Sequence, residues 1–494
     1  MRSSRTATWM ILGLASLTMI AHLFVGPAFG FHRDELQTLD DARHLAWGYV
    51  AYPPMTPFFG RLSLNLFGIS IVGFRFFASL AQAVALILTG LMAREMGGGR
   101  HAQLLAAAAY LPFALGAGAL MQYVSFDNVC WVLAAYSVVC LLQSGDPRWW
   151  LAIGAAAGLG MMAKYAMAFF AAGIFVGFLV TDARRYLANK WLLAGCAVAL
   201  VIWAPNLAWE AEHRFVSLDF LRSIHARDVS MGRAKNFLLD QLILTIAPLW
   251  IAGLIYCLRA AAAKRFRAIG WMYLFLLALF LAARGRGYYL IAAYPMLYAA
   301  GSVWWEGRLA RISAGRARGM WRIAWAVVTA SAVFVCVIAL PVAPVESAWG
   351  KFSLRVSEDL REEIGWKEMV ETVAKVRDSL PAGDRGRLAV LTANYGEAGA
   401  IDLYGGEYGL PLAISRVNSF GERGYGNSPP ETLIVVGFPS AYLDMHFASC
   451  RVAARIGNRY GVANMESTRF PDIFVCHGLR ESWPEFWREL PRYA

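Results

Sequence analysis

Long apolar segments alternate with short charged loops over the first two thirds of the chain. Runs long enough to cross about 30 Å of hydrocarbon predict about eleven transmembrane helices. The stretch 149–180 is too long for one straight crossing, so we expect a helical pair that breaks at Lys164. The eleven segments lie near 8–29, 66–93, 102–120, 127–143, 149–163, 165–181, 191–209, 237–258, 268–283, 287–304 and 322–343.

The pattern changes near Pro344. Beyond this point short apolar runs, turn clusters and amphipathic helical patterns such as Trp366–Leu380 alternate. This alternation predicts a soluble α/β domain of about 150 residues, which is long enough to bury its own core. We therefore expect a transmembrane domain at 1–344 and a second domain at 345–494. The predicted strands are Leu388–Thr392, Thr432–Val436 and Ile473–Val475.

Composition agrees with the membrane class. Apolar residues make up 58% of the 494 residues and charged residues 16%, which is typical of a polytopic α-helical membrane protein. The apolar core of the first segment exceeds the short apolar region of a cleaved signal peptide, and further spans follow. We expect it to be retained as a membrane anchor.

Lys and Arg concentrate in alternate loops, which predicts a cytoplasmic N-terminus. The outer face then receives the loops 30–65 and 210–236 and the domain 345–494, although 210–236 carries five basic residues of its own. Anchoring at anionic lipid accounts for most of the net charge of +12 without a nucleic acid. The cytoplasmic clusters are Arg94 and Arg100; Arg184, Arg185 and Lys190; Arg259, Lys264, Arg265 and Arg267; and Arg308, Arg311, Arg316, Arg318 and Arg322.

Two cysteines differ from the rest in their setting. Cys450 and Cys476 lie in the predicted outer domain, where an oxidising environment permits a disulfide, and their pairing is a hypothesis. The others fall in or beside apolar spans, where cysteine usually behaves as a small hydrophobic residue: Cys130, Cys140, Cys196, Cys257 and Cys336.

Ionisable residues at the edges of apolar segments are the candidate site. Asp34 and Glu35 follow the first span, and Asp127 opens the fourth. A charge at this depth is costly unless it has a partner or faces water, so it marks a functional site by default. Helix capping is the alternative for Asp34 and Asp127, and a solvated loop acid for Glu35. The next acids, Asp40 and Asp41, are expected on an exposed helix face and are left out of the site.

Basic and aromatic residues form a second group of candidates. Lys164 interrupts an apolar stretch, where a charge needs a partner or a water-filled cavity, or must reach the interface. Arg284 and Arg286 lie at an outer span end that the charge bias disfavours, beside Tyr288 and Tyr289. An interfacial belt of Tyr and Arg is the alternative for these four.

Several short motifs follow one another in a characteristic order. The acidic pair after the first span is followed by an aromatic amphipathic helix and the turn Tyr52-Pro53-Pro54. In order and spacing these motifs resemble the GT-C glycosyltransferases, in particular the bacterial branch related to protein O-mannosyltransferases and to the aminoarabinose transferase of lipid A. The later motifs are Ser125-Phe126-Asp127-Asn128, Ala163-Lys164-Tyr165, Ala204-Pro205-Asn206-Leu207-Ala208-Trp209, His213, Arg286-Gly287-Tyr288-Tyr289-Leu290, Ile364-Gly365-Trp366 and Asn394-Tyr395-Gly396-Glu397-Ala398-Gly399.

The resemblance implies an enzyme of the bacterial inner membrane that moves a sugar from a polyprenyl-phosphate donor to a glycan, lipid or protein on the periplasmic face. It implies inversion with Asp34 acting alone as the base, while Glu35 assists or binds the acceptor and Asp127 orients the acceptor or a metal ion. Donor phosphate would be bound by Lys164, Arg284, Arg286, Tyr288 and Tyr289, and the further candidates are His213, Tyr52 and Tyr165. The pair His32-Arg33 before the acids departs from this picture, because a cation there could favour the charged form of Asp34 and so weaken it as a base, or bind the donor instead.

The sequence leaves alternatives open for the cofactor and for the functional class of the protein. Outer-face Asp, Glu and His are scattered without a metal-binding spacing, so dependence on a divalent metal ion is undecided. Gly97-Gly98-Gly99 lacks the spacing of a nucleotide-binding loop. The competing classes are a transporter or flippase of lipid-linked sugars, which would show paired broken helices in its two halves, and a non-catalytic lipid-binding scaffold, which would lack the first-loop acid.

Overall fold

The structure is a computed structural model that describes the backbone of residues 2–493 and the side chains of residues 6–493. Within it the chain divides into two units. The helical unit comprises Met1–Phe24, Tyr52–Thr56 and Arg75–Leu340. The sheet unit comprises Val25–Ala51, Pro57–Phe74 and Pro341–Ala494, so most of the first predicted outer loop groups with the C-terminal part of the chain.

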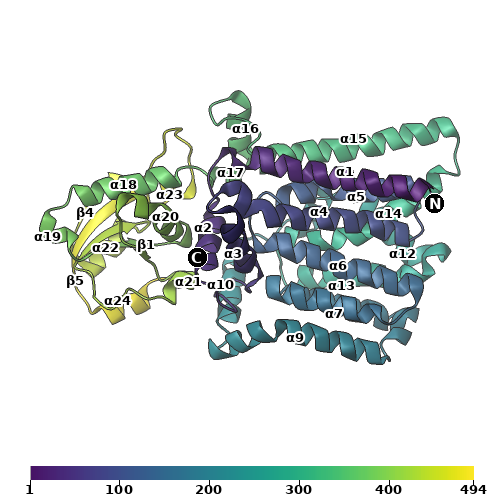
Figure 1. Ribbon diagram of the computed structural model, residues 1–494, viewed down its shortest axis with the longest axis horizontal. Coiled ribbons are helices and arrows are strands. Elements are labelled where there is room, and N and C mark those ends of the chain that lie inside the picture. The colour runs from purple at the N-terminus through teal and green to yellow at the C-terminus, as the bar shows by residue number, and fades with distance from the viewer. Residues whose placement is uncertain (1, 494) are drawn as a thin grey trace. The chain divides into compact units, whose positions relative to one another are not determined.

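Every apolar segment predicted from the sequence lies mostly in helix. Figure 1 shows α1, α4, α6, α7, α9 and α15 running beside one another. The helices are α1 (Arg2–Val25), α4 (Ile71–Glu95), α5 (Arg100–Ala117), α6 (Tyr123–Ser144), α7 (Trp149–Ala163), α8 (Met167–Leu179), α9 (Lys190–Glu212), α11 (Phe237–Ile243), α12 (Ala247–Arg259), α13 (Arg267–Ala282), η4 (Gly287–Ala293), α14 (Tyr294–Leu309) and α15 (Ala314–Ala339). Connecting them are α10 (Val216–Ser230), η2 (Asp182–Tyr186) and η3 (Ala261–Phe266).

Length and hydropathy identify the helices that can cross a membrane. In the described chain six qualify, and a seventh is added if α11 and α12, bent by 104° at their junction, form one span. Shorter apolar helices, α7 and α8, follow one another. The helical membrane fold expected from the sequence is therefore confirmed, while the number eleven stays a prediction.

The predicted break at Lys164 is confirmed. Helix α7 ends at Ala163, and Lys164 has extended backbone dihedrals of φ −161° and ψ 135°. Helix α8 then begins at Met167. The interruption leaves the Lys164 side chain at a helix junction rather than on the surface of a continuous helix.

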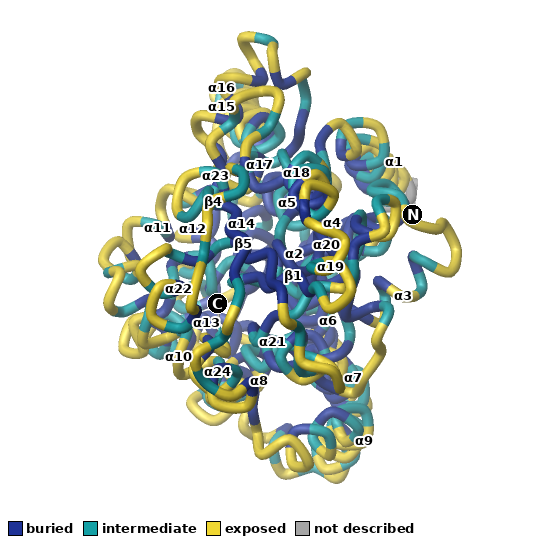
Figure 2. Tube along the Cα trace, turned by 90° about the vertical axis from the view of Figure 1, so that its left-hand side faces the viewer, coloured by how far each residue is buried: buried dark blue, intermediate teal, exposed yellow. Residues whose placement is uncertain are grey.

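Helix α9 packs along α7 but buries few of its own residues. Its buried residues are Gly195, Asn206 and Glu210, and Figure 2 shows much of the helix exposed. A Cβ atom at Gly154 of α7 would lie 2.0 Å from the Gly195 carbonyl oxygen, so glycine permits this close approach. Small residues and polar side chains are the usual means of helix contact where apolar contacts with lipid compete.

The sheet unit contains, among the described residues, a five-stranded mixed sheet of order β2-β1-β3-β5-β4. Strand β1 pairs in parallel with β2 and β3, whereas β5 is antiparallel to β3 and β4. The predicted bounds of β1 and β3 are confirmed. The strands are β1 (Leu388–Thr392), β2 (Ala413–Ile414), β3 (Thr432–Val436), β4 (Phe447–Arg455) and β5 (Asp472–Leu479).

Helices cover both faces of this sheet. Leu391 and Val435 pack in one apolar cluster with Phe486 of α24 (Trp483–Glu489) and Leu443 of α22 (Ser440–His446). Helix α18 contacts β3, and helix α20 contacts β1. The sheet unit also contains α2 (Arg33–Arg43), α3 (Met55–Phe67, which begins in the helical unit), α16 (Ala348–Val356), α17 (Glu358–Arg361), α18 (Trp366–Asp378), α19 (Ala382–Arg385), α20 (Tyr395–Tyr404), α21 (Asn418–Gly421) and α23 (Met465–Thr468).

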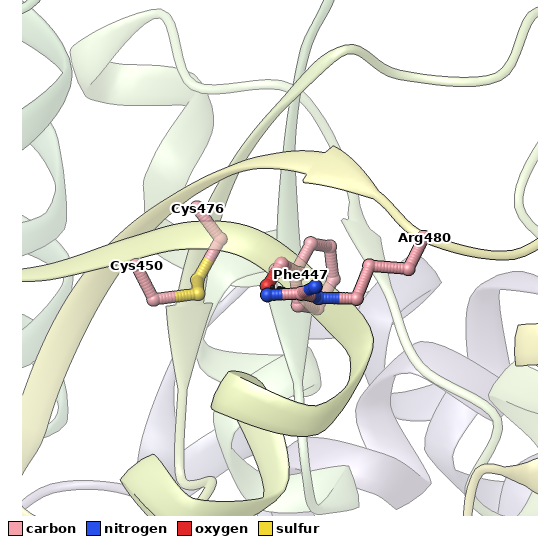
Figure 3. The surroundings of a disulfide bond; sticks show 4 residues. All are labelled: Phe447, Cys450, Cys476 and Arg480. Carbon is pink, nitrogen blue, oxygen red and sulfur yellow. Dashed lines mark hydrogen bonds between the residues drawn. A yellow bond between two sulfur atoms is a disulfide. The ribbon is translucent and has the colours of Figure 1, made fainter.

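The hypothesis of a disulfide between Cys450 and Cys476 is confirmed. The two cysteines are register partners on β4 and β5, with Cα atoms 4.2 Å apart, and their sulfur atoms are bonded. Figure 3 shows the bond beside Phe447, whose carbonyl oxygen accepts a hydrogen bond from Arg480 Nε at 2.8 Å. The bond therefore fastens the edge strand β4 to the sheet.

Removing this disulfide should destabilise the sheet unit. The cysteines are 26 residues apart, and closing a loop of this length raises the free energy of the unfolded chain by about 3.5 kcal/mol. We expect the double variant Cys450→Ser/Cys476→Ser to lose about that much stability, measured by hydrogen exchange of the β4 and β5 amides in the full chain. Cys336→Ser, a free cysteine of α15, is the control. Unchanged exchange in the double variant would contradict the expectation.

The position expected for Asp40 and Asp41 is wrong. Both are buried in α2, with exposed fractions of 2% and 1%. Asp40 forms an ion pair with Arg423, and Asp41 Oδ2 accepts a hydrogen bond from the Ser419 hydroxyl at 3.3 Å. Their polarity suggested exposure to solvent, because the sequence pattern does not reveal partners that lie almost 400 residues away along the chain.

Candidate functional site

Lys164 lies among three tyrosine rings in the helical unit. Its Nζ atom is 5.1 Å from the ring centre of Tyr123, 5.0 Å from Tyr289 and 6.0 Å from Tyr288. We call these four residues the lysine cage. Tyr123 opens α6, Lys164 occupies the break between α7 and α8, and the two other tyrosines begin η4. Aromatic faces stabilise a cation and leave the lysine N–H groups able to donate to an anion.

Arg286, predicted to bind phosphate, already has an anionic partner. Its Nε and Nη2 atoms donate to the two carboxylate oxygens of Asp228 at 2.5 and 2.7 Å, and Asp228 also pairs with Arg233 at 3.2 Å. Arg286 Nη1 donates to the Tyr288 hydroxyl at 3.1 Å. The arginine therefore orients one wall of the lysine cage while its charge is balanced by Asp228.

Asp127 is buried in the helical unit, with 5% of its surface exposed. Helix α6 begins at Tyr123 after the N-cap Gln122, so Asp127 lies inside the helix and the capping alternative is wrong. Its Oδ1 atom has no hydrogen-bond partner among the described residues, and the charge of Lys164 acts on this carboxyl group. A buried carboxylate oxygen without a partner is unusual in a protein interior.

The two other candidate tyrosines adjoin the lysine cage. The ring centre of Tyr52 lies 6.0 Å from that of Tyr123. The Tyr165 hydroxyl, next in sequence to Lys164, lies within hydrogen-bond distance of Glu210 Oε1 at 2.9 Å and of Asn206 Oδ1 at 3.2 Å. These contacts tie the α7–α8 break to the buried polar residues of α9.

Neither Arg284 nor His213 contacts the lysine cage in the described part of the chain. Both are exposed, and Arg284 has left-handed backbone with φ 49°. His213 follows the end of α9, where its ring stacks on Trp209 at 3.9 Å and its Nδ1 atom lies 2.8 Å from the Trp209 carbonyl oxygen. For His213 these local contacts agree with a helix-end role.

Asp34 and Glu35 lie in α2 of the sheet unit and have different environments. The N-cap of α2 is His32, whose side chain accepts from the Asp34 N–H, so Asp34 is not the cap. Glu35 is fully buried and completes a capping box by accepting from the His32 N–H at 2.9 Å. Asp34 keeps 40% of its side chain exposed, and its Oδ1 accepts from the Tyr395 hydroxyl at 2.8 Å.

Arg33 lies over the Tyr395 ring in the same unit. Its Nε atom is 4.0 Å from Asp34 Oδ1, and its guanidinium carbon is 5.6 Å from the Tyr395 ring centre. Burial would lower the pKa of Arg33, but Tyr395, Asp34 and neighbouring glutamates raise it above its ordinary value. Arg33 therefore remains a cation in this partly buried acidic environment.

Two buried glutamates near Arg33 bind their protons more tightly than an ordinary glutamate does. Burial raises the pKa of Glu397 to about 7, although backbone hydrogen bonds from Asn394 and Ala393 oppose the rise. Burial also raises the pKa of Glu466, and repulsion from Glu362 and Glu397 raises it further. Both groups therefore hold protons in the folded state that the unfolded chain would release at lower pH.

The sheet unit should become less stable as pH rises. Between about pH 4.5 and pH 7 the folded state binds more protons than the unfolded state at these glutamates, so the free energy of unfolding falls with pH. Glu466→Gln should flatten this slope, measured by hydrogen exchange of β1 and β3 amides across this range. Glu407→Gln, at an exposed acid, is the control. An unchanged slope in Glu466→Gln would contradict the expectation.

One group of side chains in the described chain has metal-ligand spacing. Potential ligand atoms of His446, Glu481 and Glu489 lie within 4.8 Å of one another. His446 Nδ1 and Glu481 Oε1 are 2.5 Å apart, which is a hydrogen-bond separation, and Glu489 is exposed. The contact is explained without a metal ion, so we assign no ion to it.

The structure adds residues that sequence reasoning missed. Tyr123 lies beside Lys164, and Asp228 pairs with Arg286. Glu210 lies within hydrogen-bond distance of Tyr165, and Tyr395 donates a hydrogen bond to Asp34. Asp228 carried a signal, because it is an acid within an unusually basic loop that the sequence predicts on the outer face. Tyr395 carried one too, because it lies inside a motif that the resemblance had marked.

A family profile and solved structures match this chain. The profile described as dolichyl-phosphate-mannose-protein mannosyltransferase matches residues 51–209. Comparison with curated protein sequences finds no match. The profile covers Tyr52, Asp127, Lys164 and Tyr165, four of the candidate residues.

The structural matches extend over nearly the whole chain. ArnT from Cupriavidus metallidurans bound to undecaprenyl phosphate matches with a TM-score of 0.62 and 16% identity, over 95% of this chain and 98% of that chain. The same protein in its apo state matches with a TM-score of 0.61 and 15% identity, over 96% and 98%. The oligosaccharyltransferase AglB from Archaeoglobus fulgidus matches with a TM-score of 0.50 and 12% identity, over 87% and 69%. The resemblance predicted from the sequence is thus confirmed at the level of the fold, which this chain shares with ArnT and AglB.

Proposed function

We propose that the protein is a membrane glycosyltransferase that uses a polyprenyl-phosphate-linked sugar. An acceptor hydroxyl attacks the anomeric carbon of the sugar, a new glycosidic bond forms, and the bond from that carbon to the phosphate oxygen breaks. The hydroxyl proton passes to Asp34, and polyprenyl phosphate leaves with the electron pair of the broken bond. A single displacement of this kind inverts the anomeric configuration.

The lysine cage is the observation that carries this proposal. The cation Lys164 lies among three tyrosines at a break in apolar helices, and the structures that share this fold include ArnT bound to undecaprenyl phosphate. An ammonium group and phenolic hydroxyls are suited to a phosphate whose negative charge grows as the leaving group departs. Lys164, Tyr288 and Tyr289 are therefore assigned to the donor phosphate, with Arg286 orienting Tyr288.

The acids are assigned by their environments. Asp34 is partly exposed, so an acceptor hydroxyl can reach it, and its carboxylate can take a proton. Asp127 is buried beside the charge of Lys164, and we assign it to orienting that lysine or the donor headgroup. Glu35 is fully buried in the capping box, so we remove it from the reacting groups.

We infer the location from the charge distribution and the partners from the proposed reaction. The N-terminus and the basic clusters are placed in the cytoplasm, and the sheet unit on the periplasmic side of a bacterial inner membrane. The acceptor is then a glycan, lipid or protein of the cell envelope. Membrane lipids are the remaining partners, and no nucleic acid is involved.

Mass spectrometry of envelope lipids and glycans tests this proposal in cells. Cells that contain the protein should carry an envelope component heavier by one glycosyl residue than the same component in cells that lack it. Cells that contain only the variant Asp34→Asn should show the same envelope profile as cells that lack the protein. Identical envelope profiles with and without the protein, under conditions where it is made, would count against a transferase.

A further inference from the structure

The motif Asn394-Tyr395-Gly396-Glu397-Ala398-Gly399 lies at the carboxyl end of β1, beside the end of β3. Asn394 caps α20, and Glu397 completes the capping box by accepting from the Asn394 N–H. In α/β sheets the crevice outside the carboxyl ends of parallel strands is where ligands usually bind. In this sheet unit that position receives α2, the helix that carries Asp34.

Two glycines of the motif allow α2 to approach closely. A Cβ atom at Gly396 would lie 2.3 Å from Arg33 Cγ, and one at Gly399 would lie 2.7 Å from the Leu36 carbonyl oxygen. Neither glycine has positive φ, so backbone conformation does not explain them. Contact with α2 does, because any larger residue would force the two helices apart.

Tyr395 places its hydroxyl on the acid. Its Oη atom donates to Asp34 Oδ1 at 2.8 Å across 361 residues of sequence. Burial raises the pKa of Tyr395, and the charge of Asp34 raises it as well, so the phenol keeps its proton and acts as a donor. A hydrogen bond to a charged acceptor is stronger than one between neutral groups.

We propose that Tyr395 is a positioning residue for Asp34, and that the motif at 394–399 exists to hold the base in place. This inference rests on the proposed function, because it assigns a role to Tyr395 in the same reaction. It gives the C-terminal sheet a part in transfer: the sheet unit orients the acid by one hydroxyl and two close helix contacts. The remaining motif residues then act on the orientation of α20.

Replacing the hydroxyl alone tests the inference. Tyr395→Phe should lower kcat by about 10- to 100-fold, the effect of one hydrogen bond to a charged group, and leave KM for the lipid-linked donor unchanged. The acid limb of the pH–rate profile should move to higher pH, because a hydrogen bond to a carboxylate favours its charged form. Tyr408→Phe is the matched control, since its hydroxyl donates to Glu371 in the same unit.

A second variant keeps the test decisive if Tyr395→Phe does not fold. Gly399→Ala suits a helix interior but inserts a Cβ atom against Leu36, so it should lower kcat with unchanged donor KM. Wild-type kcat and an unshifted pH profile in the folded variants would overturn the inference. If Asp34→Asn were itself fully active, the base assignment would fail instead, which separates the two outcomes.

Discussion

Asp34→Asn should transfer sugar about 10²- to 10⁴-fold more slowly than the wild-type protein and bind donor equally well. This range is the usual contribution of a positioned general base. Asparagine has nearly the same shape as aspartate and can still accept the Tyr395 hydrogen bond, so α2 should keep its contacts. It cannot take the proton of the attacking hydroxyl, and the chemical step alone should suffer.

The measurement is single-turnover transfer by purified full chain in lipid nanodiscs, together with equilibrium binding of the lipid-linked donor. Asp444→Asn, an exposed acid of α22, is the control and should transfer at the wild-type rate. Full activity of Asp34→Asn would remove this residue from the chemistry. Loss of donor binding in the same variant would instead give Asp34 a binding role.

Lys164→Ala should weaken binding of polyprenyl phosphate by about 10- to 100-fold, the effect expected for one charge-assisted hydrogen bond. The three tyrosines around Lys164 would remain, but they carry no formal charge to balance the phosphate. Affinity for the acceptor should change little. The loss should be larger at low ionic strength, because salt screens the interaction that is removed.

Binding of polyprenyl phosphate itself is the measurement here, since it isolates the phosphate contact from the sugar. Lys164→Arg should retain most of the affinity, and Lys190→Ala, at an exposed lysine beginning α9, should retain all of it. Unchanged affinity in Lys164→Ala would assign the phosphate to another group. Arg284, which is exposed, would then be the first residue to examine.

Much of the fold was predictable because apolar runs and breaks are local signals. Lys164 in an apolar stretch predicted the junction between α7 and α8, and continuous apolar runs predicted β1 and β3. Strand β4 was missed because it lies at the edge of the sheet, where most of its side chains are exposed and its sequence is mixed. Residue type alone does not identify such a strand.

The candidate site was predictable only in part, because its partners are distant in sequence. Lys164 was predicted from its place in an apolar stretch, and Tyr288 and Tyr289 from their place beside Arg286; the structure brings the three together. Asp34 was predicted to be the base, with helix capping as the alternative, but the identity of its partner Tyr395 depends on how α2 packs against α20. Local patterns describe one element at a time, and this packing joins two.

A measurement of what becomes of the lipid-linked donor tests the central claim most directly. Purified protein in nanodiscs is supplied with polyprenyl-phosphate sugars and an envelope extract, and free polyprenyl phosphate is quantified by mass spectrometry. The account predicts one polyprenyl phosphate released for each glycosyl residue gained by the extract, and almost none with Asp34→Asn. Donor that stays intact, or that crosses the bilayer without cleavage, would contradict it.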